Sequence, residues 1–160
     1  MKGSKLLLIL VLIFTFIISF VSCDSNQAPV YEKYLKMKNA SWDRFDIKQF
    51  EIPFGEKDMN IDITLVVRCN EQLKYDKIPF YAILTTPKGE ESIREISVPV
   101  RESGKLITEP KGTKPDSRIV LWKNINVAAK SNCKISIENM IPKIQTAGIE
   151  AVGIVVTKTK

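Results

Sequence analysis

The side chains that most often carry enzymatic chemistry are scarce in this 160-residue chain. The chain has no histidine, which excludes Ser-His-Asp and Cys-His catalysis and the usual ligand sets of zinc hydrolases. Two carboxylate pairs remain as a conceivable acid and base for glycoside cleavage, Asp43 with Asp46 and Glu90 with Glu91. Both pairs lie in turn-like segments among lysines, which favours a solvated surface. No glycine-rich phosphate loop is present. We therefore predict no enzyme activity, no metal site and no cofactor.

The first of three cysteines, Cys23, ends an apolar segment. Two lysines precede the apolar run Leu6–Phe20, as in a bacterial secretory signal, and the run is shorter than the about 20 residues that span a membrane. Small or aliphatic residues directly before Cys23 resemble the lipobox of bacterial lipoproteins, in which the cysteine is acylated and the peptide is cut before it. An uncleaved anchor helix or an ordinary signal peptide is the alternative. We expect a signal peptide over residues 1–22 and a lipidated tether over residues 23–30.

Fatty acids such as palmitate on Cys23 would attach the chain to a membrane of the cell envelope. The outer membrane is favoured, and the domain would face the periplasm or the cell surface. Export would also permit a disulfide between Cys69 and Cys133, since the envelope is oxidising. Such a bridge would close a long loop and contribute about 4 kcal/mol in the chain-entropy model. Two separate, half-buried thiols are the alternative.

The charge of the chain is mildly basic, with a formal net charge of +6. Most basic residues stand singly among acids, as in "KYDK" and "ESIREI", instead of forming a stripe that would follow a phosphate backbone. We therefore expect no nucleic-acid partner.

The elements that must position any site are predicted to be strands. Apolar residues alternate with polar ones over 59–69, which is typical of a half-buried strand. Segments 78–86 and 92–100 flank the turn sequence "PKGE" and predict a hairpin. Further candidates lie at 47–54, 118–122, 133–139 and 151–157, whereas 101–117 is expected to be a surface loop. The pattern predicts an all-β fold, one antiparallel β-sandwich of about seven strands over residues 31–160.

Four aromatic side chains could form a stacking platform for a sugar: Tyr31, Trp42, Tyr75 and Trp122. Trp122 follows Val120 and Leu121, which favours a place in the core, and Trp42 could cover one end of the sandwich. We favour core packing over a platform.

Several short motifs, in this order, resemble the GldH gliding-motility lipoproteins of Bacteroidetes. They follow Cys23 as "VYEKY", Trp42, "VVRCNEQLKY" with Arg68, Asn70 and Tyr75, "TTPKGE", "LWKNINV" and "AGIEAVGIVV" with Gly148, Glu150 and Gly153. The resemblance covers nearly the whole chain beyond the signal. It implies an envelope lipoprotein that works alongside the gliding and type IX secretion machinery, and it implies no catalytic residue. Cys69 and Cys133 are not part of this pattern.

The function that we expect is non-catalytic binding to other envelope proteins at the membrane surface. The candidate surface residues are Arg68, Asn70, Tyr75 and Trp42. A glycan-binding surface lipoprotein is the alternative. A glycan binder should show aromatic rings side by side on an exposed face, whereas a protein-binding subunit should show a mixed apolar and polar patch.

Overall fold

A computed structural model describes residues 28–107 and 116–159 of the chain. Cys23, the expected signal peptide and most of the expected tether lie outside these residues. Within them, no helix is long and apolar enough to cross a membrane. The elements, in chain order, are β1 (Tyr31–Lys36), the short helix η1 (Lys38–Ala40), β2 (Ser41–Asp43), β3 (Lys48–Pro53), β4 (Met59–Cys69), β5 (Lys77–Thr85), β6 (Glu91–Pro99), β7 (Arg101–Glu102), β8 (Lys105–Leu106), β9 (Asp116–Val127), β10 (Asn132–Asn139), β11 (Gln145–Ala147) and β12 (Ile149–Lys158).

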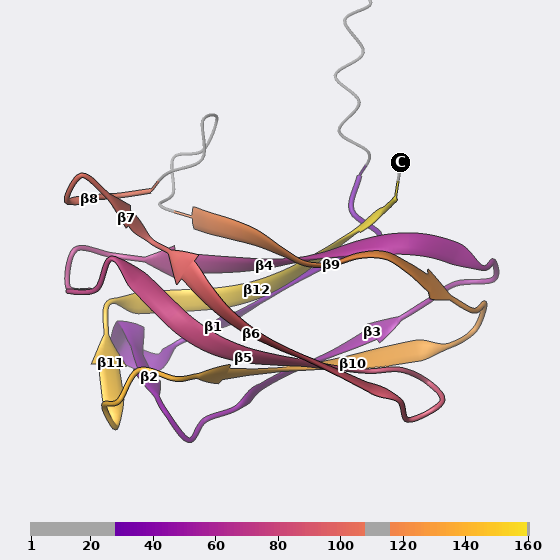
Figure 1. The fold of residues 1–160 in the computed structure, drawn as a ribbon, viewed down its shortest axis with the longest axis horizontal. Coiled ribbons are helices and arrows are strands. Elements are labelled where there is room, and N and C mark those ends of the chain that lie inside the picture. Colours follow the sequence, from indigo (N-terminus) through magenta and orange to yellow (C-terminus); the bar gives the residue numbers. More distant parts are fainter. Residues whose placement is uncertain (1–27, 108–115, 160) are drawn as a thin grey trace, which may run out of the picture.

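Two four-stranded antiparallel sheets face each other (Figure 1). One sheet has the order β1-β12-β4-β9 and the other the order β3-β10-β5-β6. Two small ladders, β2 with β11 and β7 with β8, lie beyond them. The predicted all-β fold and antiparallel sandwich are confirmed.

The alternation in β4 places its apolar residues between the sheets, as the sequence predicts. Ile61, Ile63, Leu65 and Val67 are fully buried in the core between the sheets. On the outer face of the sheet, Asp62 and Thr64 are half-buried and Val66 is buried. Phe80, Ala82 and Leu84 of β5 face the core from the opposite sheet. Each strand can bury only one face against the other sheet, so the period of two decides which residues are inside.

The predicted number of about seven strands is wrong, because the described residues form twelve. The sequence does not reveal β1 or the strands of two or three residues, which are β2, β7, β8 and β11. The apolar residues of β1 have a spacing that also suits a helical turn, and its strand is defined by pairing with β12, from Tyr31 opposite Val156 to Lys36 opposite Ala151. The expected loop 101–117 contains β7 and β8, and β9 begins within it. Tertiary pairing overrides weak local preference at these places.

The outward face of β4 also has a structural task. Asp62 Oδ1 accepts hydrogen bonds from the backbone N–H of Asn124 and from the Thr159 hydroxyl, both at 2.8 Å. Asn124 has the left-handed φ of 54°, and the register of β4 against β9 shifts between Ile61 and Thr64. Asp62 therefore holds an irregular part of β9 against β4. The two donors keep the pKa of this carboxyl below its ordinary value of 3.8.

This arrangement predicts an acid-sensitive contribution to stability. Because the folded pKa of Asp62 is depressed, its contribution is present above the unfolded value of 3.8 and is lost as the pH falls through the folded value. Asp62→Ala should be less stable than wild type at pH 6, and the difference should shrink below pH ~4. Urea unfolding of both proteins across this range measures the effect. A difference that stays constant down to pH ~2 would contradict the assignment.

Candidate functional site

The family-motif residues Arg68 and Tyr34 meet on the outer face of the β1-β12-β4-β9 sheet. Arg68 donates to both carboxylate oxygens of Asp116, with Nε at 2.6 Å and Nη2 at 2.7 Å, and its guanidinium lies 5.3 Å from the centre of the Tyr34 ring. The hydrogen bonds to Asp116 raise the pKa of Arg68. Tyr34 lies across Gly153, where an added Cβ would come within 2.6 Å of the ring carbon Cε1. Arg68 is thus engaged by its own domain.

Asn70 and Tyr75 are likewise used internally. The Asn70 amide donates to Glu150 Oε1 at 3.1 Å and accepts from the backbone N–H of Gln72 at 3.0 Å. Tyr75 packs partly buried against the core, with Lys143 Nζ 5.5 Å from the centre of its ring. The structure brings these candidates to one end of the sandwich, where they join strands and loops to one another.

Trp42 is not a surface residue, contrary to its place among the surface candidates. Its side chain is completely buried and lies 5.5 Å from Phe80, measured between ring centres. Trp122 is 2 % exposed, and Tyr31 and Tyr75 are packed against the core. The core packing that the sequence favours for the tryptophans is correct. The reason is their size: a large, mostly apolar ring contributes more by burial than by exposure. These four rings form no stacking platform.

The disulfide between Cys69 and Cys133 does not form in this structure, where both thiols are free and buried. Cys69 ends β4, whereas Cys133 lies near Val127, which is paired with Met59 at the beginning of β4. Ten residues of strand separate these ends by about 33 Å. A disulfide needs Cα atoms within about 7 Å of each other. The sequence places each cysteine at the end of a predicted strand, but it could not show that these strand ends lie at opposite ends of the sandwich.

The two carboxylate pairs lie in different surroundings: Asp43 and Asp46 line the same pocket, whereas Glu90 and Glu91 lie outside it. Asp46 is held by an ion pair with Lys48, and Glu90 and Glu91 are exposed at the β5–β6 turn. No cluster of three or more His, Cys, Asp or Glu side chains suited to a metal occurs in residues 28–107 and 116–159.

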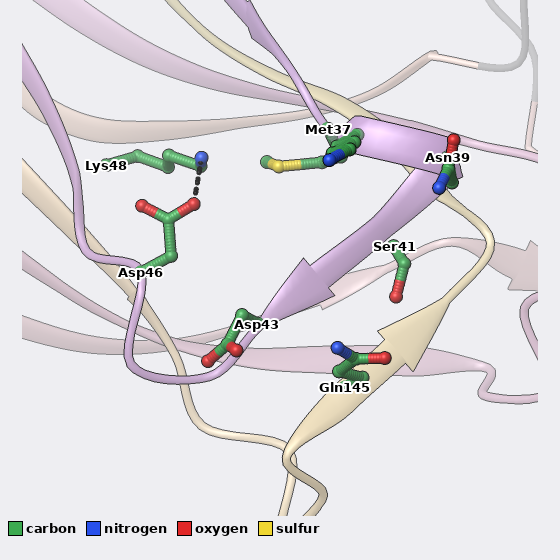
Figure 2. Close-up of a pocket in the computed structure, with 8 residues that line it drawn as sticks. Met37, Asn39, Ser41, Asp43, Asp46, Lys48 and Gln145 are labelled. Atoms are coloured by element: carbon green, nitrogen blue, oxygen red, sulfur yellow. Dashed lines mark hydrogen bonds and ion pairs between the residues drawn. The ribbon is translucent and has the colours of Figure 1, made fainter.

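A polar pocket lies beside the β2–β11 ladder, with a volume of about 420 Å³. It is lined by Met37, Lys38, Asn39, Ser41, Asp43, Asp46, Lys48 and Gln145. Figure 2 shows Ser41, Asp43 and Gln145 on the two strands of the ladder. It also shows the ion pair between Asp46, on the neighbouring loop, and Lys48, the first residue of β3. Asn39 and Ala40, at the edge of the pocket, have left-handed φ values of 54° and 50°. No aromatic side chain lines the pocket, which therefore offers hydrogen bonds and charges but no stacking surface.

Three large apolar side chains project from the two loops next to this pocket. Phe45 is 78 % exposed, Ile47 is 47 % exposed and Ile144 is 70 % exposed. A hydrogen bond of 2.8 Å from the backbone N–H of Arg44 to the carbonyl of Ile144 holds the loops together. We call Phe45, Ile47 and Ile144 the apolar trio. The sequence does not single out this trio, although apolar residues within the charged stretch "DRFDIK" are a signal.

Both loops that carry the apolar trio are tied to the body of the domain. The buried Trp42 indole donates to the carbonyl of Asp46 at 2.8 Å, and Asp43 Oδ1 accepts from the Phe45 backbone N–H at 2.9 Å. In the second loop, the buried Asn139 amide donates to the Thr146 hydroxyl at 3.2 Å and accepts from the Ile141 backbone N–H at 3.1 Å. The apolar side chains are therefore presented on ordered backbone.

The comparison with protein families decides the membership of the chain. Residues 29–156 match the family model described as GldH lipoprotein. The chain belongs to the GldH lipoprotein family. The match includes the motifs around Tyr34, Arg68 and Gly153 that meet on the outer sheet face. No curated protein matches the chain.

Solved structures resemble this GldH lipoprotein only remotely. A family GH115 4-O-methyl-alpha-glucuronidase with specificity for decorated arabinogalactans is 10% identical, with a TM-score of 0.46. The match covers 85% of this chain and 18% of that one. The structure of infectious bursal disease virus Gx strain is 15% identical, with a TM-score of 0.34, over 86% of this chain and 33% of that one. The GldH lipoprotein thus spans about a third or less of the length of these two chains.

The buried cysteines of the GldH lipoprotein lead to a chemical prediction. Burial raises the pKa of the Cys69 thiol to about 12, and burial also raises the pKa of Cys133. Neither thiol should react with iodoacetamide at pH 8 in the folded protein, because the thiolate is the reactive form. Both should react fully in denaturant without reductant. Mass spectrometry of protein exported to the periplasm measures both states, and peptides joined through Cys69 and Cys133 would contradict the structure.

Proposed function

We propose that this GldH lipoprotein is a non-catalytic subunit of the cell envelope that binds other envelope proteins at the membrane surface. Its setting is the gliding-motility and type IX secretion machinery, and its anchor is lipid on Cys23, with the outer membrane favoured. The observation that carries the proposal is the mixed surface at one end of the sandwich, where the apolar trio adjoins the polar pocket.

This surface has the character of a protein interface. Exposed apolar side chains beside polar groups mark interaction sites, and aromatic and long aliphatic anchors contribute most of the binding free energy of such sites. Sugar-binding sites use exposed aromatic rings for stacking, and the aromatic candidates of this chain are buried or packed against the core. The mixed surface favours protein binding over the glycan-binding alternative.

The proposal is tested by separating the domain from its anchor. Wild type should incorporate a labelled fatty acid at Cys23, and Cys23→Ala should not. A variant exported with an ordinary cleavable signal should fold normally, because the described core begins after the tether. It should fail to restore spreading or secretion to a deletion strain. Complete restoration by this soluble variant would show that membrane attachment is dispensable, and absence of label at Cys23 in wild type would disprove the anchor.

A further inference from the structure

The apolar trio lies at the end of the domain opposite to the start of the described chain. The backbone N–H of Val30 donates to the carbonyl of Val156, and β1 runs from there along β12 to Lys36. Pairing continues through Ser41 opposite Ala147 to the hydrogen bond between Arg44 and Ile144. Six residues of β1 alone advance about 20 Å. In Figure 1 the chain enters near the end of β12, whereas β2 and β11 lie at the far end.

A lipid on Cys23 would limit how far the start of β1 can lie from the membrane. Even a fully extended chain from Cys23 to Ala28 covers only about 17 Å, because each residue spans at most about 3.5 Å. The start of β1 is therefore kept close to the membrane that holds the lipid. With that end held, the apolar trio lies at the end of the domain that can be farther from the same membrane.

The charges around the apolar trio are predominantly positive. The adjoining loops and the pocket carry four basic and two acidic side chains: Lys38, Arg44, Lys48, Lys143, Asp43 and Asp46. Lys48 already neutralises Asp46. We call the four basic residues the basic rim. Two copies of the chain meeting through this surface would bring the basic rims together, which opposes self-association.

We propose that the apolar trio and the basic rim are a docking surface for another envelope protein, one that presents an apolar pocket with an acidic border on the side away from the anchoring membrane. This inference rests on the proposed function. The apolar trio supplies the side chains that become buried on binding. The basic rim orients the partner and speeds its association through complementary charge. Ordered loops reduce the entropy that the chain loses on binding, since the anchors are already held in place.

The test uses the full-length, lipidated protein in a deletion strain. Phe45→Ser with Ile144→Ser removes two anchors, and Arg44→Glu with Lys143→Glu reverses half of the basic rim. The matched control is Ile93→Ser, which removes an apolar side chain that is 62 % exposed on β6, elsewhere on the domain. Both double variants should lose at least about tenfold in complementation, while Ile93→Ser should match wild type. The thermal midpoint of each variant should lie close to that of wild type, because Phe45, Ile93, Lys143 and Ile144 are exposed and Arg44 is half-buried. This measurement separates a loss of binding from the loss of the Lys143–Tyr75 contact.

A photo-crosslinking residue identifies the occupant. Placed at position 45, it should give an adduct with another protein, and the adduct yield should fall at least about tenfold with Arg44→Glu and Lys143→Glu. The same residue at position 93 should give no such adduct. An adduct with a second copy of the chain would overturn the proposal. So would Phe45-dependent sedimentation of the purified domain with phosphatidylethanolamine and phosphatidylglycerol vesicles.

The two proposals can fail separately. Full complementation by both double variants, combined with failure of the soluble variant, would overturn the docking surface and leave the anchored binding function intact. Full complementation by the soluble variant would show that the lipid anchor is not needed. It would then contradict both the proposed function and the position of the docking surface relative to the membrane.

Discussion

Replacing Gly148 with alanine is expected to destabilise the domain by about 3 to 5 kcal/mol. Gly148 joins β11 to β12 with φ +90°, a conformation that L side chains rarely adopt. An added Cβ would also overlap the backbone nitrogen of Leu73 and would lie 2.6 Å from its Cα. Backbone cannot move aside as a flexible side chain can, so the strain of φ and the overlap act together.

The surroundings of Gly148 increase the expected effect of this change. Its N–H donates to the carbonyl of Ala40 at 2.7 Å, and its carbonyl accepts from the N–H of Asn70 at 2.9 Å. Any shift that relieves the overlap with Leu73 therefore disturbs hydrogen bonds to two other segments. The end of the sandwich that carries the apolar trio depends on this junction.

Gly89→Ala is the matched control for Gly148→Ala. Gly89 also has a positive φ, +81°, but an added Cβ meets nothing within 4 Å. Gly89→Ala should reduce the free energy of unfolding only by the conformational strain of the positive φ, about 1 to 2 kcal/mol. Urea unfolding of wild type and both variants separates the two contributions. Equal losses at the two glycines would show that the close approach of Leu73 has no energetic consequence.

Ile63→Ala is expected to reduce the free energy of unfolding by about 2 to 5 kcal/mol. Ile63 is fully buried in the middle of β4, between Val156 of β12 and Trp122 of β9 in the register of the sheet. The cost combines the lost transfer of apolar surface from water with the cavity that the smaller side chain leaves. Urea denaturation provides the measurement.

The control for Ile63→Ala is Thr64→Ala at the next position of β4, where the side chain faces outward. This change should cost less than about 1 kcal/mol. Asp62 would be a poorer control, because it holds Asn124 and Thr159. A loss at Thr64 as large as that at Ile63 would mean that the two faces of β4 had been exchanged.

The place of Ile63 was predictable from the sequence, whereas the role of Gly148 was not. Alternation along 59–69 is a local property, and a strand in a two-layer fold must bury one face whatever its neighbours are. The isolated letter Gly148 carries no such pattern. Its importance depends on Leu73, a residue far away in the chain that the fold brings against it.

The candidate site was predictable only in part. The motifs around Arg68, Asn70 and Tyr75 lie at the end of the sandwich that carries the apolar trio, but the structure shows these side chains in contacts within the domain. The apolar trio at the same end went unrecognised, because Phe45 and Ile47 read equally well as core residues. Whether a side chain is exposed depends on the residues that pack around it, so the amino-acid sequence of this segment could not show that Phe45 and Ile47 are exposed.

The class of the fold and the family could be predicted without a structure, since the strand alternation and the ordered motifs are properties of the chain itself. The sequence also excludes histidine-dependent chemistry. Three facts become visible only in the three-dimensional fold: Cys69 and Cys133 lie apart, Trp42 is buried, and the loop of Ile144 is hydrogen-bonded to the loop that carries Phe45. The physical reason is that each of these facts depends on which strands pair and which sheet edges meet. Those long-range contacts arise from the summed burial of many residues, and no single segment encodes them.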